Sequence, residues 1–495
     1  MKTKILDCTL RDGGYYTNWD FDPDIVEKYI KYSNELNIDY IEIGYRNNKN
    51  PIEYKGQFYY SPKGTLEYFK KNSNHKIALM IDFKSIDLSQ AKNLLLDCVG
   101  LVDLIRIAAS PDQLDNIQPF ISQIKNLGFE VALNIMYLSN WNITKMKKSL
   151  ANIKDVDFIY LVDSFGSVFP DQLEKIINEI KSISKNKLGF HSHDNIELAF
   201  SNTLTAINNK IDIVDSTILG MGRGAGNLKT ELLLMKLIFN SKESYKTYDA
   251  LSNLVEAFLP LKQIYNWGSD ISYKFAGINS YPQKDIMFLK LSKNYEFSQI
   301  LGHFEKKNNK KTSLKDISLS IIKNNLDTII VGGGISIKSH ENAIQKFIKK
   351  KNYNIIFLTT RYSNLNDNKF SNVFQIVLGS DVSKVKKIKS KNIKYIFPLN
   401  EGENYENKEF YSFKIEDKFQ DKINHVLASL LLVNKITKSK NIFALGFDGF
   451  DQSNKYFNVF EQNEEIFKSF KNSYNITSLT DTKYSIKSDS IYSYL

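Results

Sequence analysis

The chain of 495 residues has only two cysteines, Cys8 and Cys98, and no uninterrupted apolar run of about 18 residues. Two cysteines cannot form a disulfide framework or a thiolate metal site, so we expect both in the hydrophobic core. The missing apolar run excludes a membrane-spanning helix, and the segment MKTKILDCTL lacks an apolar stretch of signal-peptide length. We therefore expect a cytoplasmic globular protein with no membrane partner.

Arginine is also scarce, because only five of the 66 basic residues are arginines: Arg11, Arg46, Arg106, Arg223 and Arg361. The formal net charge of +11 would suit a nucleic-acid-binding protein if the positive side chains were clustered. They are instead spread through amphipathic segments, so we expect a solvated surface and no nucleic-acid partner. Where lysine is the usual cation, an arginine indicates a need for the planar guanidinium, which binds carboxylates in a bidentate manner.

Short β-branched runs alternate with helical periodicity from residue 4 to about residue 240. Eight runs are almost continuously apolar, and each precedes a predicted helix; they span residues 4–10, 40–45, 76–82, 104–109, 130–137, 158–164, 187–193 and 212–222. This order predicts an α/β protein whose first part is a (β/α)8 TIM barrel. Its active site should lie at the carboxyl ends of the strands.

Metal-binding residue types occur at two of these predicted strand ends. Asp12 follows the first strand, and His191 and His193 end the seventh. Alternate side chains of a strand share one face, about 7 Å apart, so one cation can bridge both imidazoles. Two imidazoles and a carboxylate suit Mn, Zn, Fe(II) or, less typically, Mg, and leave coordination positions open. The alternative interpretation is a pair of structural histidines.

Other polar residues gather at the same predicted rim, namely Arg11, Arg46, Asp163, Ser164 and the glycine-rich segment 220–227. Arg46 and Arg223 bind either substrate anions or neighbouring carboxylates, whereas Arg106 lies inside its strand, which favours a structural role. Ser164 either contacts substrate or caps the following turn. Random placement would put about half of these residues at the opposite rim, so the pattern supports a site here.

Four motifs lie in order on the first, sixth, seventh and eighth predicted strands: DCTLRDGG, VDSFG, GFHSHDN and GMGRGAGN. Together they resemble the DRE-TIM metallolyase superfamily, also called the HMG-CoA lyase-like family, and most of all its 4-hydroxy-2-oxovalerate aldolase-like members. The resemblance covers roughly residues 1–305 and implies a catalytic barrel at 1–245 and a helical extension at 246–311. It implies an aldolase or lyase acting next to the carbonyl of a 2-oxo acid such as pyruvate, with an aldehyde as the second compound.

The resemblance also implies residue roles. Asp12, His191 and His193 would hold a divalent metal, Mn²⁺ or Mg²⁺ before Zn²⁺ or Co²⁺, and Asn227 matches a further ligand of some members. Arg11 would contact substrate and stabilise the enolate that forms when the carbon–carbon bond breaks. Glu42 and Asp163 would orient these groups without contacting the metal or the substrate themselves. Alternatively, Arg11 is only the salt-bridge partner of Glu42.

Tyr15 departs from the family pattern, because the pyruvate aldolases carry a histidine there that acts as the base for the substrate hydroxyl. We therefore expect the base to be Tyr15 with a lowered pKa, or a water molecule on the metal. A Claisen-type lyase or synthase using an acyl-CoA is the alternative enzyme. A barrel without turnover, acting in ligand binding or assembly, is the alternative from another class.

Beyond residue 312 the alternating pattern restarts and predicts a smaller Rossmann-like α/β domain at 312–495. Gly332–Gly334 form a glycine-rich turn, but Ile337 occupies the third glycine position of a dinucleotide motif, and Arg361 ends the next strand where an acidic residue is expected. We therefore assign no dinucleotide cofactor. IIVGGGIS and LGFDGF resemble nucleotide-binding domains of pterin pyrophosphokinase-like and surface-glycan proteins, which implies a nucleotide or nucleotide-sugar ligand. A structural role or a role in a homo-oligomer is the alternative.

Overall fold

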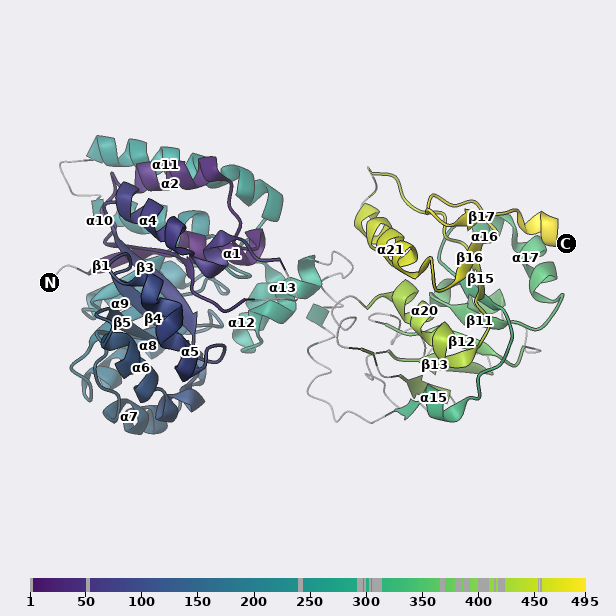
Figure 1. Ribbon diagram of the computed structural model, residues 1–495, viewed down its shortest axis with the longest axis horizontal. Coiled ribbons are helices and arrows are strands. Elements are labelled where there is room, and N and C mark those ends of the chain that lie inside the picture. The colour runs from purple at the N-terminus through teal and green to yellow at the C-terminus, as the bar shows by residue number, and fades with distance from the viewer. Residues whose placement is uncertain are drawn as a thin grey trace. The chain divides into compact units, whose positions relative to one another are not determined.

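The chain divides into two compact units, Met1–Leu291 and Ser292–Leu495 (Figure 1). The computed structural model describes residues 3–49, 54–238, 244–291, 314–365, 370–378, 392–398, 409–413, 423–452 and 456–495, with 297, 300, 301, 304, 381, 385, 415, 416 and 454. Within these residues, no helix is both long enough and apolar enough to cross a membrane.

The predicted (β/α)8 barrel of the first unit is confirmed. Eight parallel strands close in sequence order, from β1 to β8: Lys4–Asp7, Tyr40–Tyr45, Lys76–Asp82, Leu104–Ala109, Glu130–Ile135, Phe158–Asp163, Lys187–Ser192 and Ile213–Ser216. β1 closes the ring by pairing with β8, with Leu6 opposite Asp215. Cys8 and Tyr160 belong to the packed interior of this ring, so the barrel is a filled core.

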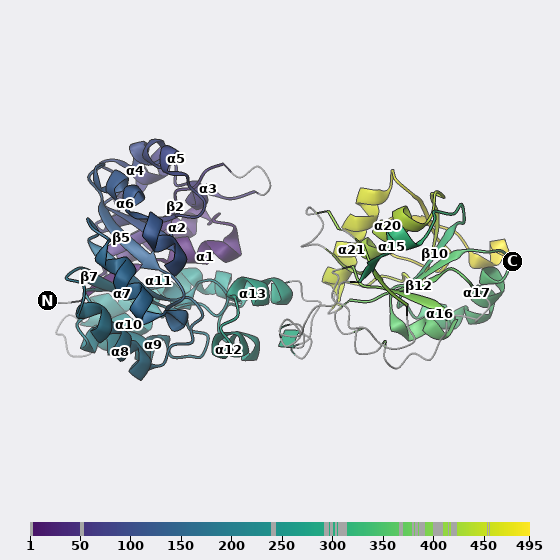
Figure 2. The same ribbon diagram turned by 90° about the horizontal axis from the view of Figure 1, so that it is seen from below.

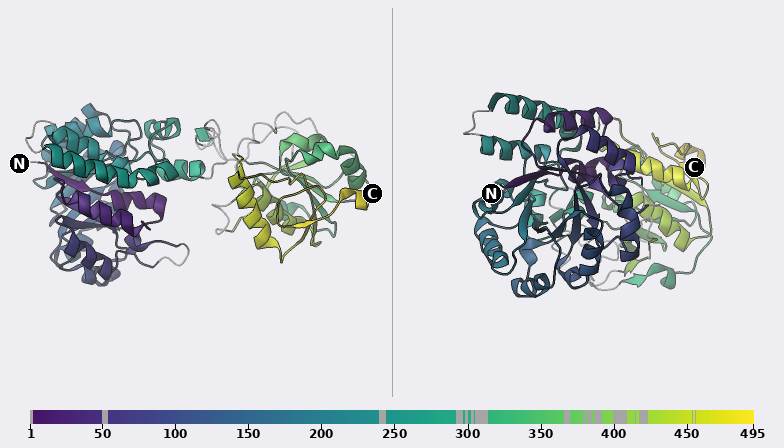
Figure 3. Two further views of the ribbon diagram at one scale, coloured as in Figure 1. Left: turned by 90° about the horizontal axis from the view of Figure 1, so that it is seen from above. Right: turned by 60° about the vertical axis from the view of Figure 1, so that its left-hand side comes forward.

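Helices surround the strands, as the right panel of Figure 3 shows. They are α1 to α10: Thr9–Thr17, Pro23–Ser33, Gln57–Tyr60, Lys63–Asn72, Leu88–Leu95, Gln118–Lys125, Ile143–Ala151, Pro170–Lys181, Ala199–Asn208 and Thr230–Ile238. α8 illustrates why they form, because Pro170 occupies its first turn and Leu173, Ile176, Ile177 and Ile180 are buried on one face.

The segment expected to end the first strand is a helix instead. β1 stops at Asp7, and α1 (Thr9–Thr17) contains both Arg11 and Asp12. Gly14 fits this helix because the ring of Trp19 packs on it, and a Cβ at Gly14 would lie 2.1 Å from that ring. The last strand is also shorter than predicted, since β8 ends at Ser216 and the chain continues as a 3₁₀ turn at Ile218–Gly220.

The helical extension begins with α11 (Ser244–Tyr265) and continues through α12 (Ile271–Ile278) and α13 (Gln283–Leu291). α11 packs along α2, where the rings of Phe258 and Tyr29 meet with centroids 6.1 Å apart. The structure groups these three helices with the barrel. Most of the predicted extension beyond them, residues 292–311, lies outside the described residues, and the limits 245 and 311 stay predictions.

The second unit is a nine-stranded parallel sheet in the order β17-β16-β15-β10-β11-β12-β13-β14-β9. In chain order, β9 to β17 are Lys315–Asp316, Thr328–Val331, Asn354–Phe357, Val373–Ile376, Ile393–Ile396, Glu409–Ser412, Asn441–Leu445, Asn475–Ser478 and Lys487–Ser488. Its helices are α15 (Ile317–Ser320), α16 (Ser336–Ser339), α17 (Glu341–Ile348), α20 (His425–Ile436) and α21 (Phe457–Phe470).

Helices cover both faces of this sheet, with α16 and α17 on one face and α20 on the other (Figure 2). Side chains of β10 alternate accordingly, because Ile329 and Val331 pack toward α17, whereas Ile330 packs toward α20. The expected Rossmann-like arrangement is therefore present. The strands at the two sides of the sheet, β9, β14, β16 and β17, are short.

Candidate metal centre

Three metal-binding side chains converge at the carboxyl end of the barrel. One ligand atom from each of Asp12, His191 and His193 lies within 4.8 Å of the other two, and all three residues are buried. The Nε2 atom of His191 is 3.7 Å from Oδ2 of Asp12, and the two imidazole centroids are 5.0 Å apart at an interplanar angle of 76°. Residues 180 positions apart in sequence thus form one compact donor set.

Hydrogen bonds orient both imidazoles for ligation. Nδ1 of His191 lies 2.8 Å from the Asp215 carboxylate and donates to it, which leaves Nε2 free toward Asp12. Nδ1 of His193 lies 3.1 Å from the carbonyl oxygen of Ser164 and 2.6 Å from the side-chain amide nitrogen of Gln283, so both groups fix the position of this ring. Burial and the neighbouring His191 hold the pKa of His193 at about 3, so this imidazole is neutral at pH 7. A neutral imidazole is the form that binds metals.

The hydrogen bonding of Asn227 indicates whether these residues fit a metal ion. Its amide nitrogen donates to Oδ2 of Asp12 at 2.5 Å, whereas its buried Oδ1 has no hydrogen-bond partner among the described residues. A Cβ on Gly222 would lie 2.5 Å from this amide, so glycine there leaves room for it. A buried amide oxygen without a donor is costly unless a cation lies beside it. The set of one carboxylate, two imidazoles and this oxygen therefore fits a divalent cation.

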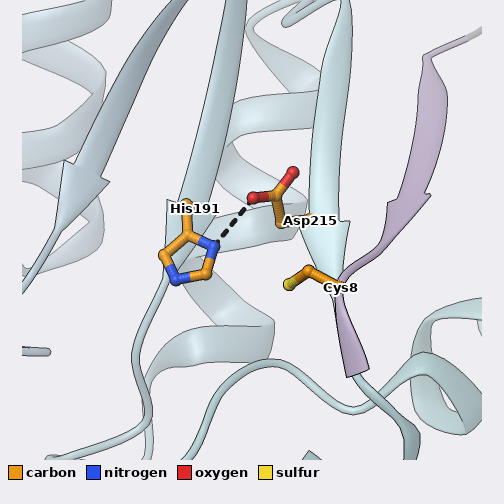
Figure 4. A group of neighbouring side chains, drawn as sticks. All are labelled: Cys8, His191 and Asp215. Atoms are coloured by element: carbon orange, nitrogen blue, oxygen red, sulfur yellow. Dashed lines mark hydrogen bonds and ion pairs between the residues drawn. The ribbon is translucent and has the colours of Figure 1, made fainter. Parts of the chain in front are cut away.

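A second cluster shares His191 with the first. Figure 4 shows the imidazole turned toward Asp215, with the thiol of Cys8 beside them. Burial raises the pKa of the Cys8 thiol well above its usual value, so the thiol stays protonated and is a poor ligand. Oδ2 of Asp215 already accepts hydrogen bonds from His191 and Arg106. These contacts favour the cluster that contains Asp12 as the metal centre.

Alternating charges form a closed ring beneath this cluster. Oε2 of Glu42 accepts from Nε of Arg11 and from Nη1 of Arg106, both at 2.8 Å, and Nη2 of Arg106 donates to Asp215 at 2.5 Å. Asp215 binds His191, which faces Asp12, and Arg11 pairs with Asp12 at 2.8 Å. We call this set the charge ring: Arg11, Glu42, Arg106, Asp215, His191 and Asp12. It lies on five elements, α1, β2, β4, β7 and β8.

The ring sets the charges of its members. Burial alone would raise the pKa of Asp12. The neighbouring Arg11 and His191 lower it by more than burial raises it, so the pKa lies well below its usual value. Burial likewise opposes the charge of Asp215, and Arg106 outweighs it and lowers that pKa. Both carboxylates are therefore ionised at neutral pH, Asp12 as a candidate metal ligand and Asp215 as the hydrogen-bond acceptor for His191.

Tyr15 lies at the mouth of this centre and not in the ring. Its hydroxyl is 3.0 Å from the hydroxyl of Tyr45, and its ring meets Trp19 edge to face with centroids 4.9 Å apart. The guanidinium of Arg223 lies over the Tyr15 ring, 3.9 Å from its centroid. The predicted base thus belongs to a group of aromatic side chains covered by one cation.

The structure corrects the expected substrate contact of Arg46. Its guanidinium donates to the carbonyl oxygens of Leu94, Tyr60 and Ser61 and pairs with Asp97 at 3.2 Å. Through these hydrogen bonds, Arg46 joins the segment at Tyr60 and Ser61 to the end of α5. The three carbonyl groups need a hydrogen-bond donor, and Arg46 supplies it. Arg46 therefore holds loops together and is not available to a substrate.

Ser164 and Asp163 end β6 close to His193. The hydroxyl of Ser164 accepts the backbone N–H of Tyr137 at 2.9 Å, and its carbonyl lies against His193. The carboxylate of Asp163 accepts the N–H groups of Ser167 and Val168 at 3.1 and 3.2 Å. Burial raises the pKa of Asp163 to about 6. Both residues shape the turn that supports His193, whereas a substrate contact of Ser164 stays a prediction.

Two contributors to the centre were missed in the sequence. Asp215 orients His191, and its signal was present, because IVDS at 213–216 repeats the V-D-S pattern that ends β6. Gln283 of α13 donates to the carbonyl of Ser164 at 3.2 Å and accepts the N–H of Ala225, also at 3.2 Å. No local pattern marks Gln283, since it reaches the site only through the packing of the extension.

Comparisons with known proteins agree with this geometry. A family model described as HMGL-like matches residues 106–257. Oxaloacetate decarboxylase of Mycobacterium tuberculosis is 25% identical over 288 residues, which are 56% of this chain and 83% of that protein. The 4-hydroxy-2-oxovalerate aldolase of Thermomicrobium roseum is 26% identical over 294 residues, covering 56% of this chain and 79% of its own.

A solved structure is more similar in sequence. The crystal structure of the N-terminal domain of a protein assigned as an aldolase from Bacteroides vulgatus is 42% identical to this chain, with a TM-score of 0.56. The match covers 61% of this chain and 99% of that domain. At this identity and coverage, the two chains are related in sequence as well as in fold.

Proposed function

Because this chain belongs to the HMGL-like family, we propose that it is a divalent-metal-dependent lyase acting on a 2-oxo acid. It breaks or makes the carbon–carbon bond next to the carbonyl group of a pyruvate-type compound. The single observation that carries the proposal is the convergence of Asp12, His191 and His193 with Arg11 paired to Asp12. The two curated relatives named above act on 2-oxo acids by their names, which supports the same substrate class.

Asp12, His191, His193 and Asn227 would hold the cation, and we propose Mn²⁺ or Mg²⁺. When bound, it supplies a Lewis acid for the carboxylate and keto oxygens of a 2-oxo acid. Arg11 contributes a fixed guanidinium, and Glu42 holds it through Nε so that its remaining N–H groups point toward Asp12. A cation held in place needs little reorganisation when negative charge develops on the substrate oxygen.

In the cleavage direction the substrate is a 4-hydroxy-2-oxo acid. A base takes the proton of the 4-hydroxyl group, the bond between C3 and C4 breaks, and an aldehyde leaves. The bonding electron pair remains on the pyruvate-type fragment as an enolate, which then takes a proton at C3. We propose Tyr15, acting as its phenolate, as the base. Its oxygen takes the proton of the 4-hydroxyl group, and the hydroxyl of Tyr45, 3.0 Å away, can donate a hydrogen bond to that oxygen before the transfer.

Exchange of the pyruvate methyl protons tests the enolate half of this reaction. In heavy water with Mn²⁺ or Mg²⁺, we expect the wild-type chain to exchange these protons, followed by NMR. Asp12→Ala should abolish exchange because the carboxylate ligand is lost. Asp24→Ala, which removes an exposed carboxylate of α2, is the matched control and should exchange normally. Wild-type protein that binds the metal without exchanging pyruvate or short 2-oxo acids would refute the proposal, and acyl-CoA-dependent thiol release would indicate a Claisen-type enzyme.

The variant Tyr15→Phe distinguishes aldol cleavage from decarboxylation of oxaloacetate, the reaction in the name of one relative. Both reactions form the enolate of pyruvate, but only the aldol reaction needs a base at a hydroxyl group. Tyr15→Phe should therefore lower aldol cleavage by about 10²-fold or more and leave oxaloacetate decarboxylation within a few-fold of wild type. Equal losses of both activities would mean that Tyr15 only packs the site.

For the second unit, we propose that residues 312–495 bind a nucleotide or a nucleotide-sugar. The support is the crossover between β10 and β15, where strand order reverses, since parallel sheets bind ligands at such points. Gly334 lies there, with its N–H bonded to the carbonyl of Gly446. Equilibrium binding of nucleotides to the full chain tests this, and binding of none would leave an assembly role, checked by the oligomeric state. A cytoplasmic location stays a prediction, tested by cell fractionation.

A further inference from the structure

Arg223 differs from the other four arginines in what accepts its hydrogen bonds. Arg11 and Arg106 pair with carboxylates of the charge ring, Arg46 binds three carbonyls and Asp97, and Arg361 donates to the carbonyl of Gly333 at 3.3 Å. Among the described residues, no carboxylate, carbonyl or hydroxyl accepts from the guanidinium of Arg223. Its one observed partner is the ring of Tyr15, 3.9 Å from the guanidinium carbon.

The backbone of Arg223 is held rigidly on both sides. Its carbonyl accepts the N–H of Gly226 at 3.2 Å, and the carbonyl of Gly224 accepts the hydroxyl of Tyr16 at 2.9 Å. Gly224 and Gly226 have φ angles of 63° and 81°, which only glycine adopts without strain. This tight loop places the Arg223 side chain before any ligand binds. A fixed cation loses little entropy on binding, which is a property of recognition sites.

The guanidinium also lies beside the metal centre. Burial disfavours its charge, yet Tyr15, Tyr45 and Asp12 outweigh burial and raise the pKa of Arg223. The same charge contributes, after burial and His191, to lowering the pKa of His193. Arg223 is only partly buried, so a ligand can reach its donors. Arg223 therefore lies on the proposed base Tyr15 and within electrostatic reach of Asp12.

The position of Arg223 points to the second reactant and not to the 2-oxo acid. Arg11, which pairs with Asp12, is the cation proposed for the oxygen atoms of the 2-oxo acid, whereas Arg223 stacks on Tyr15, the base proposed for the 4-hydroxyl group that becomes the aldehyde oxygen. A partly buried guanidinium without an oxyanion partner is costly unless an anionic group of a ligand meets it.

We propose that Arg223 binds an oxyanion group on the second reactant, so that the aldehyde released or accepted by this enzyme carries a carboxylate or a phosphate. This inference rests on the proposed function and names the substrate class of that same site. The planar fork of a guanidinium matches either oxyanion with two parallel hydrogen bonds. Stacking on Tyr15 keeps the fork next to the hydroxyl that the base must reach, so recognition of the anion also places the reacting end of the aldehyde.

Condensation of pyruvate with matched aldehydes tests the proposal. Butanal and succinic semialdehyde have the same number of carbons and differ by a carboxylate in place of the terminal methyl group. Glyceraldehyde and its 3-phosphate make the corresponding pair for phosphate. Wild-type enzyme should prefer at least one charged member over its neutral partner, on the order of 100-fold in kcat/KM, as expected for a charge-assisted bidentate contact. Which pair shows the preference tells carboxylate from phosphate.

Arg223→Met should remove this preference by lowering kcat/KM for the charged aldehyde to that of the neutral one. Arg223→Lys keeps the charge without the fork and should retain part of it. Exchange of the pyruvate methyl protons should stay within about threefold of wild type in both variants, because it needs no aldehyde. Arg46→Met is the matched control, an arginine outside the site, and should keep the preference for the charged aldehyde.

The outcomes separate two kinds of failure. Loss of pyruvate exchange in Arg223→Met would overturn the inference, because Arg223 would then serve the 2-oxo acid or its enolate. Equal losses for charged and neutral aldehydes would also overturn it and leave Arg223 as a support for Tyr15. If wild-type protein exchanges no 2-oxo acid, the proposed function fails instead. Calorimetric titration with acetate and inorganic phosphate still decides the anion site in that case, since binding must be at least tenfold weaker in Arg223→Met than in wild type.

Discussion

Arg106 joins the two sides of the metal centre, and its removal is the most informative single perturbation. One guanidinium binds Glu42, which holds Arg11, and Asp215, which holds His191. Its side chain is fully buried on β4. Arg106→Met keeps a long apolar side chain in this place but leaves two buried carboxylates with one partner each.

The expected losses of stability and of metal affinity in Arg106→Met follow from these contacts. Arg106 donates at 2.8 Å to Glu42 and at 2.5 Å to Asp215, and removal of one partner from a buried ion pair costs about 3–5 kcal/mol. Glu42 and Asp215 keep Arg11 and His191, so we expect a loss of about 3–5 kcal/mol in all. Because His191 is oriented through Asp215, the metal affinity should fall by roughly 10- to 100-fold as well. Arg106→Lys, which can reach only one carboxylate, should give intermediate losses.

Urea unfolding, followed by tryptophan fluorescence, measures the change in the free energy of unfolding. All three tryptophans, Trp19, Trp141 and Trp267, lie in the first unit, so their emission reports the barrel separately from the second unit. Calorimetric titration with Mn²⁺ measures the metal affinity of the folded variants. The two measurements together separate a loss of folding from a loss of ligand orientation.

Arg46→Met is the control for Arg106→Met, because Arg46 also joins segments of the barrel but contacts no member of the charge ring. It should lose stability and keep the metal affinity of wild type. Our reasoning is refuted if Arg106→Met unfolds within about 1 kcal/mol of wild type with unchanged metal affinity, since that is the size of a surface substitution. It is equally refuted if both arginine variants weaken metal binding to the same extent.

Three further predictions concern single residues. Asn227→Ala should weaken Mn²⁺ binding at least roughly tenfold in calorimetry while the fold is kept. The pKa of Asp163 is raised to about 6, so the folded chain binds a proton that the unfolded chain has lost, and stability falls as pH rises from about 4 to 6. Asp163→Asn should remove this slope, roughly 3 kcal/mol in urea unfolding at the two pH values; a slope like that of wild type would exclude Asp163 as its source. Gly14→Ala should destabilise the barrel by about 1–3 kcal/mol because its Cβ would meet Trp19, whereas Gly64→Ala, with no atom within 4 Å, should stabilise it by up to about 1 kcal/mol; similar effects would contradict the packing argument.

The barrel was predictable because its signal is local and repeated. Eight apolar runs alternate with amphipathic helices, and buried parallel strands must be apolar on both faces. Even the clustering of Arg11, Asp163 and His191 at one rim follows from chain direction, since all strands of the barrel run in parallel. The limits of the sheet in the second unit are harder to read from the sequence, because edge strands such as β14 and β17 have few buried residues.

The segment around Tyr15 shows where local inference was wrong. The apolar run at residues 4–10 predicted one strand ending at Leu10, but the chain turns into a helix at Thr9. Only the packing of Trp19 on Gly14, with its indole N–H on the carbonyl of Arg11, gives this helix its place. Trp19, two residues beyond the end of this helix, thus packs against the motif and holds it in place.

The sequence by itself determined the barrel, the identity of the metal-ligand candidates Asp12, His191 and His193, and the departure at Tyr15, because these depend on periodicity, chain direction and residue type. Only the tertiary structure decided how the arginines are used. Arg46 and Arg106 donate to carbonyls and carboxylates of distant elements, whereas Arg223 stacks on the ring of Tyr15. Whether a cation is satisfied depends on partners far away in sequence, and that information exists only when the chain has folded.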